Sequence, residues 1–113
     1  VTLQDIPKGI SMITADDLND IQSPRIAQYL ERIRKAKVPD PGTNDWTEWQ
    51  AILADRREHI DGNPLTSINI TTDYGFGTVS SSLLAVPSSF DNEVQWKFCN
   101  GSPDKAPFNM VEL

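Results

Sequence analysis

The stretch "TVSSSLLAVPSSFDNEVQWKFC", residues 78–99, decides the fold. Both of its ends are apolar or β-branched runs of strand length, and the segment between them is rich in turn-forming residues. Two strands joined by so short a loop pair antiparallel. In the second strand, expected over residues 94–99, one face is formed by Val94, Trp96 and Phe98.

Weaker strand patterns lie on either side of this pair. The segment "SINITT", residues 67–72, alternates Ile68 and Ile70 with polar neighbours. The segment "FNMVEL", residues 108–113, has a shorter strand pattern. Residues 65–113 are therefore expected to form an antiparallel sheet.

The preceding segment, about residues 14–60, has helix patterns. In "SPRIAQYLERIRKAK", Ser23 is a suitable N-cap and Pro24 occupies the first helical position. The apolar residues that recur behind them at helical spacing are Ile26, Leu30 and Ile33. This pattern predicts a helix over residues 24–36.

Two further helices are expected on either side of that one. Asp17 follows Thr14 by three residues, a variant of the capping box that predicts a short helix. The segment "DWTEWQAILADRREH", residues 45–59, predicts a third helix. Its apolar stripe is formed by Trp46, Trp49 and Leu53, with Ile52 alongside.

These elements predict the order α-α-α-β-β-β-β. Helices followed by sequential strands with short loops indicate an α+β fold, with helices on one face of an antiparallel sheet. Residues 1–113 fit either a single domain or the C-terminal portion of a larger one.

Composition narrows the classes of function. A formal net charge of −6 argues against a nucleic-acid partner, because phosphate contacts require clustered Lys and Arg. The sequence contains neither a membrane-spanning apolar run nor a signal-peptide pattern. A single cysteine forbids an internal disulfide and is compatible with a reducing compartment. We therefore expect a cytoplasmic protein with no membrane partner.

Titratable residues offer few candidate sites. With one cysteine and one histidine a zinc site is implausible, and no metal or other cofactor is expected. Cys99 and His59 would form a thiol–imidazole pair only if the fold joins them; otherwise they are a structural cysteine and a helix-terminal cation. Asp16, Asp17 and Asp20 are either a metal site or the favourable negative start of a helix.

Hydroxyl side chains in the strand expected over residues 78–86 are the candidate ligand-binding residues. Ser80 and Ser82 share one face of that strand, and Thr78 has the same parity. Small polar residues there permit close approach, either by a packed helix or by a substrate. The glycosylation pattern at Asn69 lies in a predicted strand without a secretory signal, and we interpret it as a chance match.

Several longer stretches together resemble a known family. They are "SMITADDLND", "SPRIAQYLERIRKA", "DWTEWQAILADR", "GFGTVSSSLLAVP" and "VQWKFCNGSPDKAPF". The chain resembles the C-terminal half of the NRDE proteins, relatives of the transport and Golgi organisation proteins. The resemblance covers nearly the whole chain.

This resemblance implies an N-terminal nucleophile hydrolase-like architecture, a four-layer α-β-β-α sandwich. In the family the proposed nucleophile is a cysteine beside the initiator methionine, and an Asn-Arg-Asp-Glu motif follows early in the chain. Neither matches here, since residue 1 is Val1, the string does not occur, and Cys99 is far from that position. The resemblance implies part of an amide-bond hydrolase-like protein whose nucleophile is not in this chain.

Two other hypotheses remain open, and with them the question of whether the protein is an enzyme. One is a non-enzymatic ligand-binding or trafficking module for a small apolar or haem-like molecule. The other is a protein–protein interaction domain. The expected partners are a small-molecule ligand, a missing N-terminal portion or another protein chain, or a second copy of the same chain.

Overall fold

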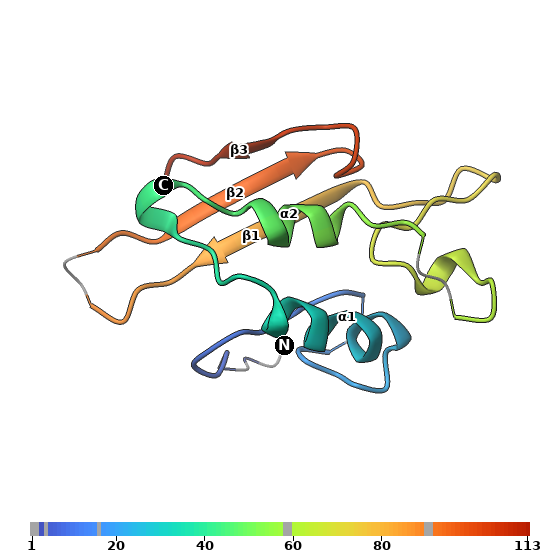
Figure 1. Ribbon diagram of the computed structural model, residues 1–113, viewed down its shortest axis with the longest axis horizontal. Helices are drawn as coiled ribbons and strands as arrows, with labels where there is room; N and C mark the ends of the chain where they lie inside the picture. Colours follow the sequence, from blue (N-terminus) through green and yellow to red (C-terminus); the bar gives the residue numbers. More distant parts are fainter. Residues whose placement is uncertain (1–2, 4, 16, 58–59, 90–91) are drawn as a thin grey trace.

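The computed structural model describes residue 3 and the ranges 5–15, 17–57, 60–89 and 92–113. The described chain has two α-helices followed by a three-stranded antiparallel sheet, so the predicted α+β class is confirmed (Figure 1). The helices are α1 (Pro24–Lys35) and α2 (Thr47–Leu53), with 3₁₀ turns at Pro41–Thr43 and Pro64–Thr66. The strands are β1 (Ser80–Ala85), β2 (Gln95–Asn100) and β3 (Phe108–Met110), and they lie in the sheet in the same order as in the sequence.

Helix α1 forms as its sequence pattern predicts. The Ser23 hydroxyl accepts a hydrogen bond from the Ile26 amide, and Pro24 takes the first turn, where an amide proton is not needed. The helix buries Ile26, Tyr29, Leu30 and Ile33. These side chains form the main core with Met12 and Ile68, and residues of α2 pack against it: Trp49, Ile52 and Leu53.

The prediction of a short helix beginning near Thr14 is wrong. The segment from Ser11 to Asp20 is a turn in the described residues, and Asn19 has a φ of 54°, which a helix does not tolerate. The Asn19 side chain accepts a hydrogen bond from the Met12 amide at 2.8 Å and donates one to the Ser11 hydroxyl at 3.0 Å. Asn19, rather than Thr14, organises this segment.

Helix α2 is shorter than expected and ends at Leu53 rather than near residue 59, although residues 58–59 lie outside the described part. Its backbone has other partners beyond that point. The Ala54 carbonyl accepts from the Asn69 side chain, and the Asp55 carbonyl accepts from the Asn69 amide. Continuing the helix would withdraw both carbonyls from Asn69.

The start of α2 is held by Asp45. One carboxylate oxygen of Asp45 accepts from the Thr47 amide at 3.2 Å and the Thr47 hydroxyl at 2.8 Å. The other oxygen lies 2.8 Å from the Lys37 ammonium. Asp45 therefore fixes both the first turn of α2 and the chain that leaves α1.

The prediction of a strand over residues 67–72 is also wrong, because this segment is a loop. Ser67 and Asn69 are fully buried, and the carbonyls of Ser67 and Ile68 accept hydrogen bonds from the Arg25 guanidinium at 3.0 and 2.6 Å. The only ladder contact in the described segment is an isolated bridge between Thr71 and Gly77. The polar groups that a strand would pair are already occupied by an arginine and by the end of α2.

The sheet itself has the expected antiparallel hairpin. Ser80 lies opposite Asn100 and Ala85 opposite Gln95, while β3 pairs with the other edge of β2 through Cys99 and Phe108. The terminal strand expected over residues 108–113 is limited to Phe108–Met110.

The two faces of the sheet differ in burial. The inner face buries Leu83, Lys97 and Cys99. Gln95 is on this face too, and its amide donates to the Pro41 carbonyl at 3.2 Å, so the inner face is the one toward the 3₁₀ turn that precedes α2. As predicted, Trp96 and Phe98 share the opposite face.

Removing the centre of the α1 core should destabilise the protein strongly. Ile26 is 0% exposed, so Ile26→Ala is expected to lower the free energy of unfolding by about 2–5 kcal/mol. Urea denaturation followed by circular dichroism measures this. Ile21→Ala is the matched control, because Ile21 is 69% exposed and its loss should cost less than about 0.5 kcal/mol. Equal effects would contradict this core assignment.

Asp45 should make the free energy of unfolding vary with pH in the acid range. Hydrogen bonds from Lys37 and Thr47 lower the pKa of Asp45 from 3.8 to about 2. The folded state thus favours the ionised carboxylate, and its contribution is complete above pH 3.8 and is lost as the pH falls toward 2. Urea denaturation across this window should show a flatter decline in Asp45→Asn than in the parent. The exposed Asp73→Asn is the control, and an unchanged slope in Asp45→Asn would refute the assignment.

Candidate functional site

The three predicted ligand-binding residues do not form one site. Ser80 and Ser82 are exposed on β1, but the Thr78 hydroxyl accepts from the Ile70 amide at 2.9 Å and donates to the Ile68 carbonyl at 3.5 Å. Thr78 therefore fastens the 68–70 loop to the sheet. None of the three lines the depression beside Pro41 and Leu113 or the depression beside Asp55 and Arg56.

Ser80 and Ser82 instead belong to a partly exposed surface that we call the outer face. It consists of Ser80, Ser82, Leu84, Trp96 and Phe98. Leu84 lies opposite Trp96 and Ser82 opposite Phe98 in the β1–β2 register, and the Trp96 indole N–H donates to the Ser82 hydroxyl at 3.0 Å. The Trp96 and Phe98 rings meet edge to face, with centroids 6.1 Å apart.

The outer face has the chemistry of a packing or binding surface. Leu84 is 56% exposed, and Val86, which follows β1, is 74% exposed. No residue of the outer face is titratable, so this surface can bind apolar or aromatic groups and offer hydroxyls, but it cannot transfer protons at neutral pH.

Cys99 has a structural role. Its side chain is fully buried, and its thiol contacts the carbonyls of Gly101 at 3.6 Å and Ala106 at 3.5 Å in the turn between β2 and β3. Burial, and after it the charge of Asp104, raises the pKa of the Cys99 thiol. A protonated thiol is a poor nucleophile. His59, the imidazole of the thiol–imidazole pair weighed above, lies outside the described residues.

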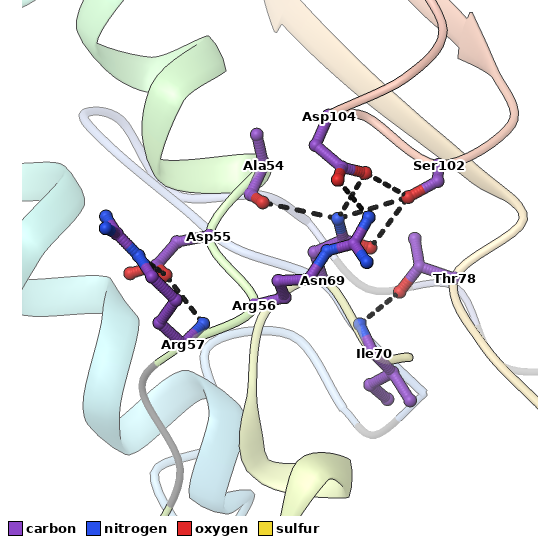
Figure 2. Close-up of polar contacts among 9 residues, drawn as sticks. All are labelled: Ala54, Asp55, Arg56, Arg57, Asn69, Ile70, Thr78, Ser102 and Asp104. Atoms are coloured by element: carbon purple, nitrogen blue, oxygen red, sulfur yellow. Dashed lines mark hydrogen bonds and ion pairs between the residues drawn. The ribbon is translucent and has the colours of Figure 1, made fainter. Parts of the chain in front are cut away.

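The most connected polar site was missed at the sequence level. Figure 2 shows the Asn69 cluster, formed by Asn69, Ser102, Asp104 and Arg56. The Asn69 side-chain nitrogen lies 3.0 Å from an Asp104 oxygen and 3.2 Å from both the Ser102 hydroxyl and the Ala54 carbonyl. Ser102 donates to Asp104 at 2.5 Å, and Arg56 forms an ion pair with the second Asp104 oxygen.

Charge in this cluster is compensated within it. Hydrogen bonds from Ser102, and then from Asn69 and Arg56, lower the pKa of Asp104, so this carboxylate stays ionised. The Ser102 hydroxyl has the Asp104 carboxylate and the Asn69 side-chain oxygen within donating distance, and the cluster contains no imidazole or amine to act as a base. The arrangement is therefore a clamp between the end of α2, the 67–70 loop and the β2–β3 turn.

One sequence feature could have indicated the cluster. Asn69 lies between Ile68 and Ile70, and a buried amide needs hydrogen-bond partners from elsewhere in the chain. Because Asn69 is 0% exposed, the folded chain does not offer it as a glycosylation acceptor.

A second charged group lies beside the cluster. Asp55 is buried and accepts hydrogen bonds from the Arg57 amide at 2.9 Å and the Arg32 guanidinium at 3.0 Å. Burial opposes ionisation, but these bonds outweigh it and lower the pKa of Asp55. An open depression of about 630 Å³ adjoins Asp55, Arg56 and Asp104, whose charges already have partners.

The remaining candidates give no catalytic or metal-binding arrangement. Among the described residues, no group of three His, Cys, Asp or Glu side chains is placed to hold a metal. Asp20 accepts from the Gln22 amide at 2.9 Å, a local turn contact, and Asp16 lies outside the described part. None of the described helices has the length and apolar run needed to cross a membrane.

Comparison with protein-family models gives no match, and no curated protein or solved structure is found to be similar to this chain. The resemblance to the NRDE proteins stays a prediction.

Removing the Asn69 side chain should loosen the clamp. Asn69→Ala leaves the Ala54 carbonyl and part of Asp104 without a donor, and we expect it to lower the free energy of unfolding by about 1–3 kcal/mol. Chemical denaturation measures the change. Asn109→Ala, at an exposed position of β3, is the control and should have little effect. A neutral result for Asn69→Ala would show that the cluster does not hold the fold together.

Proposed function

We propose that this chain is the C-terminal part of an NRDE-type, N-terminal nucleophile hydrolase-like protein and supplies a structural half rather than the nucleophile. A cytoplasmic location is part of this proposal and is favoured by the single, reduced cysteine. In this proposal the partner of the chain is the half that bears the reactive residue.

The observation that best supports the proposal is the uncovered outer face. In the described residues the inner face lies toward the 3₁₀ turn that precedes α2, while the outer face exposes Leu84 and holds the Trp96–Phe98 ring pair. A sheet with apolar side chains on both faces is typical of an inner layer of a sandwich, where two sheets pack about 10 Å apart. An α-β-β-α sandwich divided between its sheets would leave such a face open.

The chemistry of the described residues is consistent with a supporting role. In an N-terminal nucleophile hydrolase the free α-amine can serve as the base for the side chain of the same residue. The buried Cys99 thiol and the Ser102–Asp104 pair have no comparable base beside them. The amide-hydrolysing step is therefore assigned in this proposal to the other half.

A second candidate function is favoured by the two serines. Ser80 and Ser82 place hydroxyls beside the aromatic pair, which is suitable for binding a flat apolar molecule such as a haem-like ligand. In this alternative the outer face is a binding surface of a non-enzymatic module.

Tryptophan accessibility tests the first proposal against the second. If the coding sequence upstream of Val1 specifies Met-Cys and the Asn-Arg-Asp-Glu motif, the joined protein should shield Trp96 from acrylamide quenching relative to the 113-residue chain. Trp46 is buried and serves as the internal reference, and Trp96→Phe identifies the signal.

Each outcome separates the candidates. Lower quenching of Trp96 in the joined protein supports a partner half on the outer face. An upstream sequence without the nucleophile, or equal quenching in both forms, contradicts the hydrolase-like proposal. Quenching by added haem that Ser80→Ala with Ser82→Ala weakens would favour the binding module instead.

A further inference from the structure

β1 is a strand at the edge of the sheet. It pairs with β2 on one side, and no other strand of the described chain pairs with its second side. An edge strand presents a row of backbone N–H and C=O groups that a further strand can pair with.

The free edge of β1 lacks the features that usually block such pairing. Residues 80–86 contain no charged residue and no proline, and Ser80, Ser82 and Leu84 are exposed. Natural edges are commonly protected by lysines, prolines, bulges or very short strands. The opposite edge has that protection, because β3 is only three residues long and follows Pro107.

The sequence of β1 is also compatible with pairing to itself. In an antiparallel pair, directly opposite residues lie on the same face, so in a symmetric pair one residue lies opposite its own copy and the two-fold axis passes between the two copies. With the axis at Ser82, Ser80 of one copy lies opposite Leu84 of the other. With the axis at Leu83, Ser82 lies opposite Leu84. No register brings like charges together.

The exposed area is large enough to include an interface. The chain exposes 7921 Å², whereas a folded monomer of 12.6 kDa exposes about 6,200 Å². The surplus of about 1,700 Å² belongs to the chain as a whole, and the exposed Ser80, Ser82 and Leu84 of β1 contribute to it. An interface of standard size buries roughly 800 Å² on each partner.

We infer that the β1 edge binds the β1 edge of a second copy, joining two sheets into one six-stranded antiparallel sheet across a two-fold axis. The inference concerns the 113-residue chain by itself and does not depend on the proposed function.

Sedimentation of this chain over a range of concentrations tests the inference, with the double variant Ser80→Lys, Leu84→Lys. With the axis at Ser82 the new lysine of one copy lies opposite a new lysine of the other. With either axis the lysines add positive charge to both copies of β1, which then repel each other. The variant should weaken dimerisation about tenfold or more. Hydrogen exchange should show the β1 amides that face away from β2 protected in the dimer and exchanging after dilution.

Val94→Lys is the matched control. Val94 lies in line with β2, away from the β1 edge, so its substitution charges the sheet surface without touching that edge. It should leave the dimer intact. Near-ultraviolet circular dichroism of the tryptophans checks that both variants are folded. A chain that is monomeric throughout, an open-ended aggregate, or a dimer broken by Val94→Lys but not by the edge variant would overturn the inference.

Discussion

The buried side chain of Asn69 joins parts of the chain that share little other contact. Its amide nitrogen contacts the end of α2 and the β2–β3 turn, and its backbone amide donates to the Asp55 carbonyl. Asp104 extends the connection to Arg56 through an ion pair. Hydrophobic burial builds the α1 core, but that core includes no strand residue. The position of the sheet relative to the helices therefore depends on polar contacts with defined geometry beside the burial of Leu83 and Cys99 on the inner face.

The two faces of the sheet show how this arrangement relates to function. The inner face carries Lys97 and Cys99 among its buried residues, while the more strongly aromatic pair, Trp96 and Phe98, is on the other side. A self-contained two-layer protein would place its aromatic residues toward the helices. The serines that first suggested a binding site belong to this outward aromatic surface. Their polarity keeps an otherwise apolar face compatible with water.

The sequence predicts the elements whose determinants are local. Ser23, Pro24 and the apolar spacing specify α1, and the alternating runs on either side of the 86–94 loop specify β1 and β2. It fails where a distant side chain takes over the backbone. Arg25 binds the carbonyls of Ser67 and Ile68, and Asn69 binds those of Ala54 and Asp55, which removes one predicted strand and shortens one predicted helix. The position of Asn69 between two isoleucines indicates a buried amide, but its partners could not be predicted because the members of the cluster come from three separate segments.

The sequence separations within the clamp have a consequence for folding. β1, β2 and β3 are consecutive neighbours, whereas Asn69 reaches Ser102 across 33 positions and Arg56 reaches Asp104 across 48. Closing the longer loops costs more chain entropy, so local pairings form before distant ones. We therefore expect the strand meander to assemble before it docks on the helices. During that interval both faces of the sheet and the uncharged edge of β1 are exposed. Aggregation with other unfolded chains is therefore expected to be fastest at this stage.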